Sequence, residues 1–173
     1  MMFNYTEKHQ FTTRLEINEQ QIYVIDSTRL LGTIITNNLG WDMNTNNIVK
    51  KANARMELLR RVAEFGTPVQ DMKEVYKLFI RSILEQSATV WHSSLTQDNI
   101  EDLERVHKPA TRLMLNTSEM SYKTRLAILG LETLSARRET LCLNFAIKCT
   151  KCDKVSHTFP LNKKEHAMDT KTR

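Results

Sequence analysis

The strongest constraint on the fold is an apolar stripe with helical spacing that begins shortly after Trp41. Its members recur at intervals of three and four residues, which places them on one helix face: Ile48, Val49, Ala52, Met56, Leu59, Val62 and Ala63. Gly66-Thr67-Pro68 follows, and a glycine close to a proline favours the end of a helix. The segment predicts a long helix from about Asp42, capped by Asn44 or Thr45.

Similar spacing further along the chain predicts four more helices. Pro109 lies inside the third helix and should kink it or end it early, because proline lacks an amide hydrogen and clashes with the preceding turn. The second apolar face consists of Met72, Tyr76, Phe79, Ile80, Ile83, Leu84 and Ser87, and the third of Ile100, Leu103, Val106, Ala110, Leu113 and Met114. The expected ranges are 69–91, 96 onward behind a Thr96 cap, a short capped helix from Ser121 with Gly130 as its stop, and 134–151 behind a Thr133 cap.

The first 36 residues have the character of β-strands. Phe11–Ile17 and Gln21–Ile25 suit a hairpin, and Arg29–Ile35 suits a third strand whose nearly continuous apolar run predicts that both of its faces are covered. Only 4 glycines and 3 prolines occur in 173 residues, which argues against an all-β fold. We therefore predict a mainly α fold with a small N-terminal β part, a β-hairpin plus one strand followed by about five helices.

Basic residues are concentrated on the first predicted helix. Lys50, Lys51, Arg55, Arg60 and Arg61 are accompanied only by Glu57 between positions 48 and 62, and the whole chain carries a net charge of +5. Such a cluster favours nucleic acid, because lysine and arginine neutralise phosphates irrespective of base sequence. The alternative is an ordinary solvated helix face.

Several segments, taken in order, resemble the C-terminal part of a reverse transcriptase from a non-LTR (jockey-like) retrotransposon. They are Leu31-Gly32-x-x-Ile35, Leu39-x-Trp41, "KKANARMELLRR", "YKLFIRSILEQSATVWH", "LERV" and "YKTRLAILGLETLSARR", and the resemblance covers roughly residues 2–161. It implies a primer grip at Leu31, Gly32, Ile35 and Trp41, followed by a thumb. The implied domains are the end of the palm (1–41), a thumb-like helical bundle (42–116), a C-terminal helical extension (117–152) and a basic flexible tail (153–173).

The primer-grip interpretation gives Gly32 a physical role. Without a Cβ atom, a glycine lets a nucleic-acid backbone or another strand approach closely. The alternative for Gly32 is a plain β-bulge, and the alternative for Leu31, Ile34 and Ile35 is core packing. Trp41 could pack the hairpin onto the thumb or stack on a base, whereas Trp91 ends an apolar stripe and is expected in the core.

The resemblance also implies what this chain lacks. Reverse transcriptases use an aromatic-x-Asp-Asp turn to hold two Mg ions, and Asp-Asp does not occur in the sequence. By the family's order that turn would precede Met1, so we expect a truncated polymerase without catalytic residues that is inactive alone. Its expected partners are the missing palm and fingers and a primer–template duplex or RNA, bound weakly and without sequence preference. The alternative is a helical protein-interaction module derived from a domesticated retroelement fragment.

The cysteines and histidines give no second site. Cys149-x2-Cys152-x4-His157 matches three ligands of a zinc knuckle, but the fourth position is Asn162, so no cofactor, zinc included, is expected in this chain. His92 and His107 have no partner at a recognisable catalytic spacing and suit surface or packing roles.

The sequence also bears on location. Three cysteines, an odd number, argue against a disulfide framework. No apolar run is long enough for a membrane span, and the N-terminus lacks a signal-peptide core. We expect an intracellular protein of the nucleus or cytoplasm, with no membrane partner.

Overall fold

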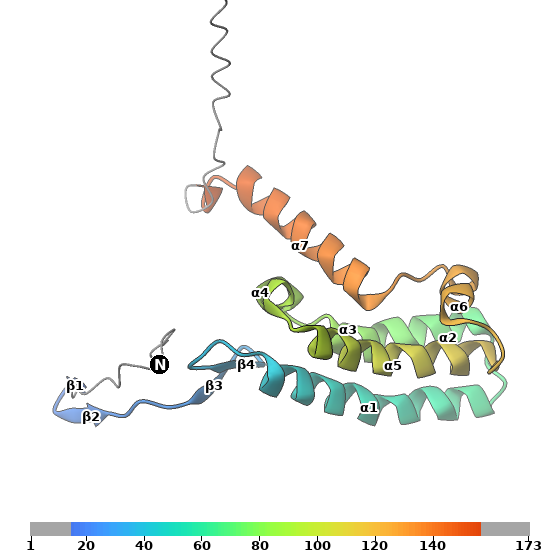
Figure 1. Cartoon of the computed structure of the whole chain (residues 1–173), viewed down its shortest axis with the longest axis horizontal. Coiled ribbons are helices and arrows are strands. Elements are labelled where there is room, and N and C mark those ends of the chain that lie inside the picture. The colour runs from blue at the N-terminus through green and yellow to red at the C-terminus, as the bar shows by residue number, and fades with distance from the viewer. Residues whose placement is uncertain (1–14, 157–173) are drawn as a thin grey trace, which may run out of the picture.

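The computed structural model describes residues 15–156 and shows a mainly helical protein that begins with two small antiparallel hairpins (Figure 1). The predicted fold class is confirmed. Five helices have eight or more residues, and the shorter segments extend or connect them. The helical elements are α1 Asp42–Glu64, α2 Val69–Tyr76, η1 Lys77–Arg81, α3 Ser82–Leu84, α4 Ala88–Trp91, η2 His92–Ser94, α5 Gln97–Leu115, α6 Tyr122–Leu129 and α7 Leu134–Lys151.

The N-terminal part contains one hairpin more than predicted. Strand β1 (Leu15–Ile17) pairs with β2 (Gln20–Ile22), and β3 (Ser27–Leu30) pairs with β4 (Thr33–Thr36). Both connections are two-residue turns with positive φ at each position, which is the backbone geometry that tight hairpins require.

The prediction of a single strand through Gly32 is therefore wrong. Leu31 (φ 48°) and Gly32 (φ 87°) reverse the chain in the middle of the apolar run, so Gly32 occupies a turn and not a bulge. Full coverage of both faces is also wrong, because Leu31 is 89% exposed and its neighbour Leu30 is exposed as well. The apolar sequence pattern did not predict the turn, because Leu31 adopts a left-handed backbone conformation that is uncommon for residues other than glycine.

Helices α1, α2 and α5 pack against one another and enclose the apolar core (Figure 1). The predicted stripes supply most of that core, so the helical periodicity is confirmed. Each fully buried leucine or isoleucine contributes about 1.5–3 kcal/mol to folding. The core residues contributed by these three helices are Ile48, Ala52, Met56, Leu59, Met72, Tyr76, Leu103, Val106, Ala110 and Met114.

The start of α1 differs from the predicted cap. Neither Asn44 nor Thr45 caps the helix, because both lie inside it and are buried. Instead, the Asn44 side-chain oxygen accepts a hydrogen bond from the backbone N–H of Ile34 at 3.0 Å. This bond ties strand β4 to the first turn of α1.

The second predicted helix is interrupted before Trp91. It continues from α2 through the π-helical turn η1 and through α3, and then breaks at Ser87, whose φ is 54°. Phe79, predicted on the apolar face, is exposed because the π turn changes the helical register. Trp91 is fully buried as predicted, and its indole N–H donates to the carbonyl of Gln86 at 3.0 Å.

The later helices follow their predicted caps. The side chains of Thr96, Ser121 and Thr133 each accept a hydrogen bond from a backbone N–H three residues later, and Gly130 ends α6 in the left-handed conformation. Helix α5 does not end at Pro109, so that alternative is wrong. Pro109 and Arg105, whose carbonyl loses its intrahelical partner, are both exposed, so water can satisfy that carbonyl.

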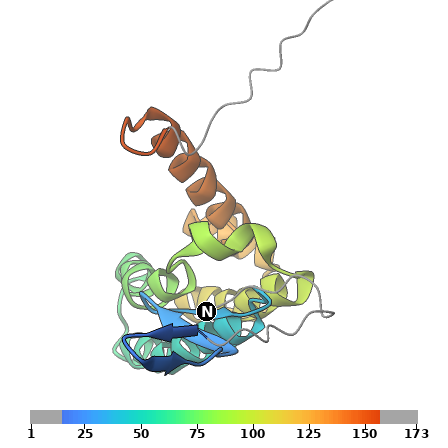
Figure 2. The ribbon, with the colours of Figure 1, turned by 90° about the vertical axis from the view of Figure 1, so that its left-hand side faces the viewer.

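Helix α7 leaves the body at an angle, and its second half extends away from the other helices (Figures 1 and 2). Its first half contacts α4 and α5. Among the helices described, we find none that combines the length and the apolar character needed to cross a membrane.

Candidate nucleic-acid interface

The β3–β4 turn projects Leu31 from the surface next to the start of α1. A Cβ atom built on Gly32 would lie 2.6 Å from the side-chain nitrogen of Gln86, which belongs to the break between α3 and α4. The glycine thus permits a close approach, but of the protein's own Gln86 side chain. The Ile34–Asn44 hydrogen bond ties strand β4, which follows the turn, to α1.

The other two primer-grip candidates lie below the surface. Ile35 is half-buried and faces Thr28 across the hairpin. Trp41 is buried in the core at the start of α1, where its ring is not available to stack on a base. Of the four candidates, Leu31 is the one that presents a large side chain to solvent.

The basic face of α1, which we define as Lys50, Lys51 and Arg55, is exposed. None of these three side chains forms an ion pair with a described residue. Arg60 and Arg61 are exposed too, but both pair with Glu57, at 3.1 and 3.6 Å. Exposed ion pairs of this kind contribute little to stability and break readily, so Arg60 and Arg61 can also contact a phosphate. Lys50, Lys51 and Arg55 can do so without first breaking an ion pair to a described residue.

A groove beside α1 adds a cation that the sequence did not single out. Arg60 of α1 and Arg112 of α5 line a hollow of about 410 Å³, together with Asn116, Thr117 and Ser118 and an apolar floor. Among the described residues, no carboxylate lines it. The periodicity placed Arg112 on the polar side of α5, but only the packing of α5 along α1 brings it next to Arg60.

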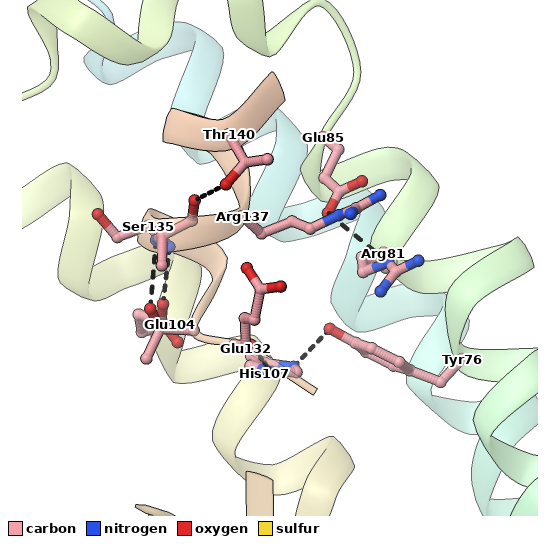
Figure 3. A network of polar contacts seen from close by, with 11 residues as sticks. Tyr76, Arg81, Glu85, Glu104, His107, Glu132, Ser135, Arg137 and Thr140 are labelled. Atoms are coloured by element: carbon pink, nitrogen blue, oxygen red, sulfur yellow. Dashed lines mark hydrogen bonds and ion pairs between the residues drawn. The ribbon is translucent and has the colours of Figure 1, made fainter. Parts of the chain in front are cut away.

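A buried hydrogen-bond network between α2, α5 and the α6–α7 connection was also missed by the sequence (Figure 3). The Tyr76 hydroxyl lies 2.5 Å from Nδ1 of His107, and Nε2 of His107 lies 3.2 Å from the carbonyl of Glu132. A neutral imidazole satisfies both bonds, with Nε2–H donating to the carbonyl and Nδ1 accepting from tyrosine. Burial lowers the pKa of His107 to about 4 and raises that of Tyr76.

Glu104 forms a second part of this network. Its carboxylate accepts a hydrogen bond from the Tyr122 hydroxyl at 2.6 Å and another from the backbone N–H of Ser135 at 3.1 Å. The second bond satisfies a free N–H in the first turn of α7, where a negative charge is favourable. Both parts of the network hold helices together, which agrees with a packing role for His107.

The cysteine cluster is only partly described. Cys142 is half-buried with its sulfur 3.8 Å from the carbonyl of Ala88, and burial raises the pKa of its thiol. Cys149 is buried and Cys152 exposed, whereas His157 lies outside the described residues. Within residues 15–156, no group of three or more His, Cys, Asp or Glu side chains is placed to hold a metal ion.

Comparisons with protein-family models, with curated proteins and with solved structures found no match for this chain.

Proposed function

We propose that this chain binds nucleic acid duplexes without sequence preference, as the primer-grip and thumb portion of a non-LTR retrotransposon reverse transcriptase. The observation that carries the proposal is the attachment of strand β4 of this hairpin to α1, on which the exposed Lys50, Lys51 and Arg55 form no ion pair with a described residue. Asn44, which anchors the hairpin, precedes Lys51 on α1 by about two helical turns. A backbone held by this face would therefore pass close to Leu31.

The chemistry of the basic face suits binding that ignores base sequence. Lysine and arginine side chains neutralise phosphates and release counterions, so affinity falls steeply as salt rises. For about three phosphate contacts, the logarithm of the binding constant should fall with a slope between about −2 and −3 against the logarithm of salt concentration. In this proposal the two Mg ions belong to the catalytic palm of the family and not to this chain. The proposed location of the protein is the nucleus or the cytoplasm.

The test is fluorescence anisotropy of a labelled RNA–DNA duplex, titrated with the full chain at several salt concentrations. The triple variant Lys50→Gln, Lys51→Gln, Arg55→Gln should reduce the magnitude of the salt slope by about 2–3, which removes most of it, and should weaken binding at low salt. The matched control removes the same charge from exposed sites on α6 and α7, with Lys123→Gln, Lys148→Gln and Lys151→Gln. Equal loss in both variants, or no duplex binding by the unmodified chain at low salt, would refute the proposal.

A second candidate function, a helical protein-interaction module, is favoured by the projecting half of α7. Leu143 and Ile147, about one helical turn apart, are exposed on one face there, and exposed apolar surface of this kind can mark a protein contact. Sedimentation at increasing protein concentration separates the two candidates. Self-association without duplex binding favours the interaction module, whereas salt-dependent duplex binding by a monomer favours the thumb.

A further inference from the structure

A small polar cavity lies away from the basic face of α1, between η1 and the segment that joins α6 to α7. Its volume is about 240 Å³, which is below the range of pockets that hold drug-sized molecules. Cationic side chains enter it from two directions, Lys77 and Arg81 from η1 and Arg137 from α7. The remaining lining residues are His107, Gly130, Leu131, Glu132 and Leu134.

Two of these cations share one counter-charge. The Nε atoms of Arg81 and Arg137 lie 3.6 and 3.2 Å from the same Oε1 atom of Glu85 (Figure 3). One carboxylate thus faces two guanidinium groups, which leaves this trio with one positive charge in a half-buried place, where solvent screens charges less than on the open surface. Glu132 in the same lining offsets that charge in the unmodified protein. No described residue hydrogen-bonds to the terminal guanidinium nitrogens of either arginine.

The other titratable residues of the cavity can be assigned as well. Lys77 pairs with Glu74 on the exposed side of the helix, an interaction of little strength. His107 is neutral, and both of its ring nitrogens are engaged by Tyr76 and by the Glu132 carbonyl. Glu132 is the one carboxylate in the lining, and Figure 3 shows it between the two arginines and His107.

We propose that this cavity binds a phosphate group, held by Lys77, Arg81 and Arg137. Guanidinium groups match the geometry of phosphate oxygens, and the free terminal nitrogens supply donors that Glu85 does not use. The π-helical turn that carries Lys77 and Arg81 is of a kind found frequently at functional sites. Glu132 opposes the bound anion, so it limits affinity in the unmodified protein.

The proposal is tested by calorimetric titration of the full chain with inorganic phosphate. We expect one saturable site with a dissociation constant of about 1 mM or lower. Lys77→Gln and Arg137→Gln, made separately so that one variant with an altered fold does not decide the test, should each weaken binding by about tenfold. Glu132→Gln should strengthen it several-fold. Lys123→Gln and Glu101→Gln make the same charge changes on exposed faces of α6 and α5 and should change nothing.

The source of the phosphate is decided by competition with oligonucleotides. If a 5′-phosphorylated oligonucleotide displaces inorganic phosphate and the 5′-hydroxyl version does not, the site takes a nucleic-acid end. If neither displaces it and a mononucleotide does, the site takes a free phosphate compound. The proposal fails if no saturable binding occurs, if the control variants lower affinity as much as the cavity variants, or if Glu132→Gln weakens binding. Duplex binding through α1 is measured separately, so either site can fail while the other stands.

Discussion

The helical body and the N-terminal hairpins are held together by different physical means. The body buries an apolar core between α1, α2 and α5 and ties its helices with buried hydrogen bonds. The hairpins have strands of three or four residues, and much of their apolar surface is exposed. The exposed apolar residues are Ile17, Leu30 and Leu31 of the hairpins and Tyr23, Val24 and Ile25 of the segment that joins them. Burial therefore specifies the body, whereas left-handed turn residues and a few anchoring contacts specify the hairpins.

The largest expected effect comes from deleting the same atoms in the two regions. Leu103 of α5 is fully buried, so Leu103→Ala should lower the free energy of unfolding by about 2–5 kcal/mol. Leu31→Ala removes the same side chain from the exposed turn and should change the free energy of unfolding by less than about 0.5 kcal/mol. Urea denaturation followed by circular dichroism measures both. Comparable losses would show that the turn is covered in solution and would break the comparison.

The second effect is a pH dependence of the body that the hairpins should not share. Burial is the main cause of the lowered pKa of His107; Arg81 and Arg138 reinforce it, and Glu104 and the Glu132 carbonyl oppose it. The folded protein holds this histidine neutral down to about pH 4, whereas the unfolded chain protonates it near 6.5. Because the unfolded state binds the proton first, stability is highest above pH 6.5 and falls as the pH drops toward 4.

The size of this loss follows from the difference between the two pKa values. A difference of about 2.5 corresponds to about 3 kcal/mol once the pH reaches 4. His107→Gln keeps an acceptor for Tyr76 and a donor for the Glu132 carbonyl, so it should flatten the stability curve between pH 4 and 6.5. His92→Gln, at a half-buried site, should leave most of the slope in place. An unchanged slope in His107→Gln would assign the pH dependence to other groups.

The sequence predicted the body far better than the hairpins, because the body is specified by burial and the hairpins by turn geometry. Regular spacing of apolar residues reports burial directly, so the stripes of α1 and α5 and the Thr96, Ser121 and Thr133 caps could be identified. The Leu31-Gly32 turn could not, because an apolar residue with positive φ leaves no signal in a hydrophobic pattern. The break at Ser87 is of the same kind.

The candidate sites divide along a similar line. The cations of α1 were identifiable because they follow one another along a single helix. The other candidate sites bring together residues that lie far apart in the sequence. They are the Arg60–Arg112 groove, the Tyr76–His107 pair and the Arg81–Glu85–Arg137 cluster. Their existence depends on how α2, α5 and α7 pack, which the periodicity of each helix does not specify.

The smallest expected effect sharpens the comparison at the turn itself. Gly32→Ala places a Cβ atom at φ 87° and 2.6 Å from the Gln86 side-chain nitrogen. Gln86 is exposed and flexible, so the backbone strain dominates and should cost about 1–2 kcal/mol. Strands β3 and β4 contribute no residue to the apolar core, so we expect the hairpin to open locally, and this cost should appear as faster hydrogen exchange of the β3–β4 amides, with the exchange of α1 and α5 core amides unchanged.

Two further variants separate backbone strain from the contact. Gly32→Asn should behave more like the unmodified protein than Gly32→Ala does, because asparagine tolerates left-handed backbone conformations. Gln86→Ala combined with Gly32→Ala should recover little protection if strain dominates. Full recovery in that double variant would mean that the steric clash of the new Cβ atom with Gln86, and not backbone strain, causes the loss of protection. Slower folding or weaker protection in the α5 core would instead show that hairpin and body form one cooperative unit.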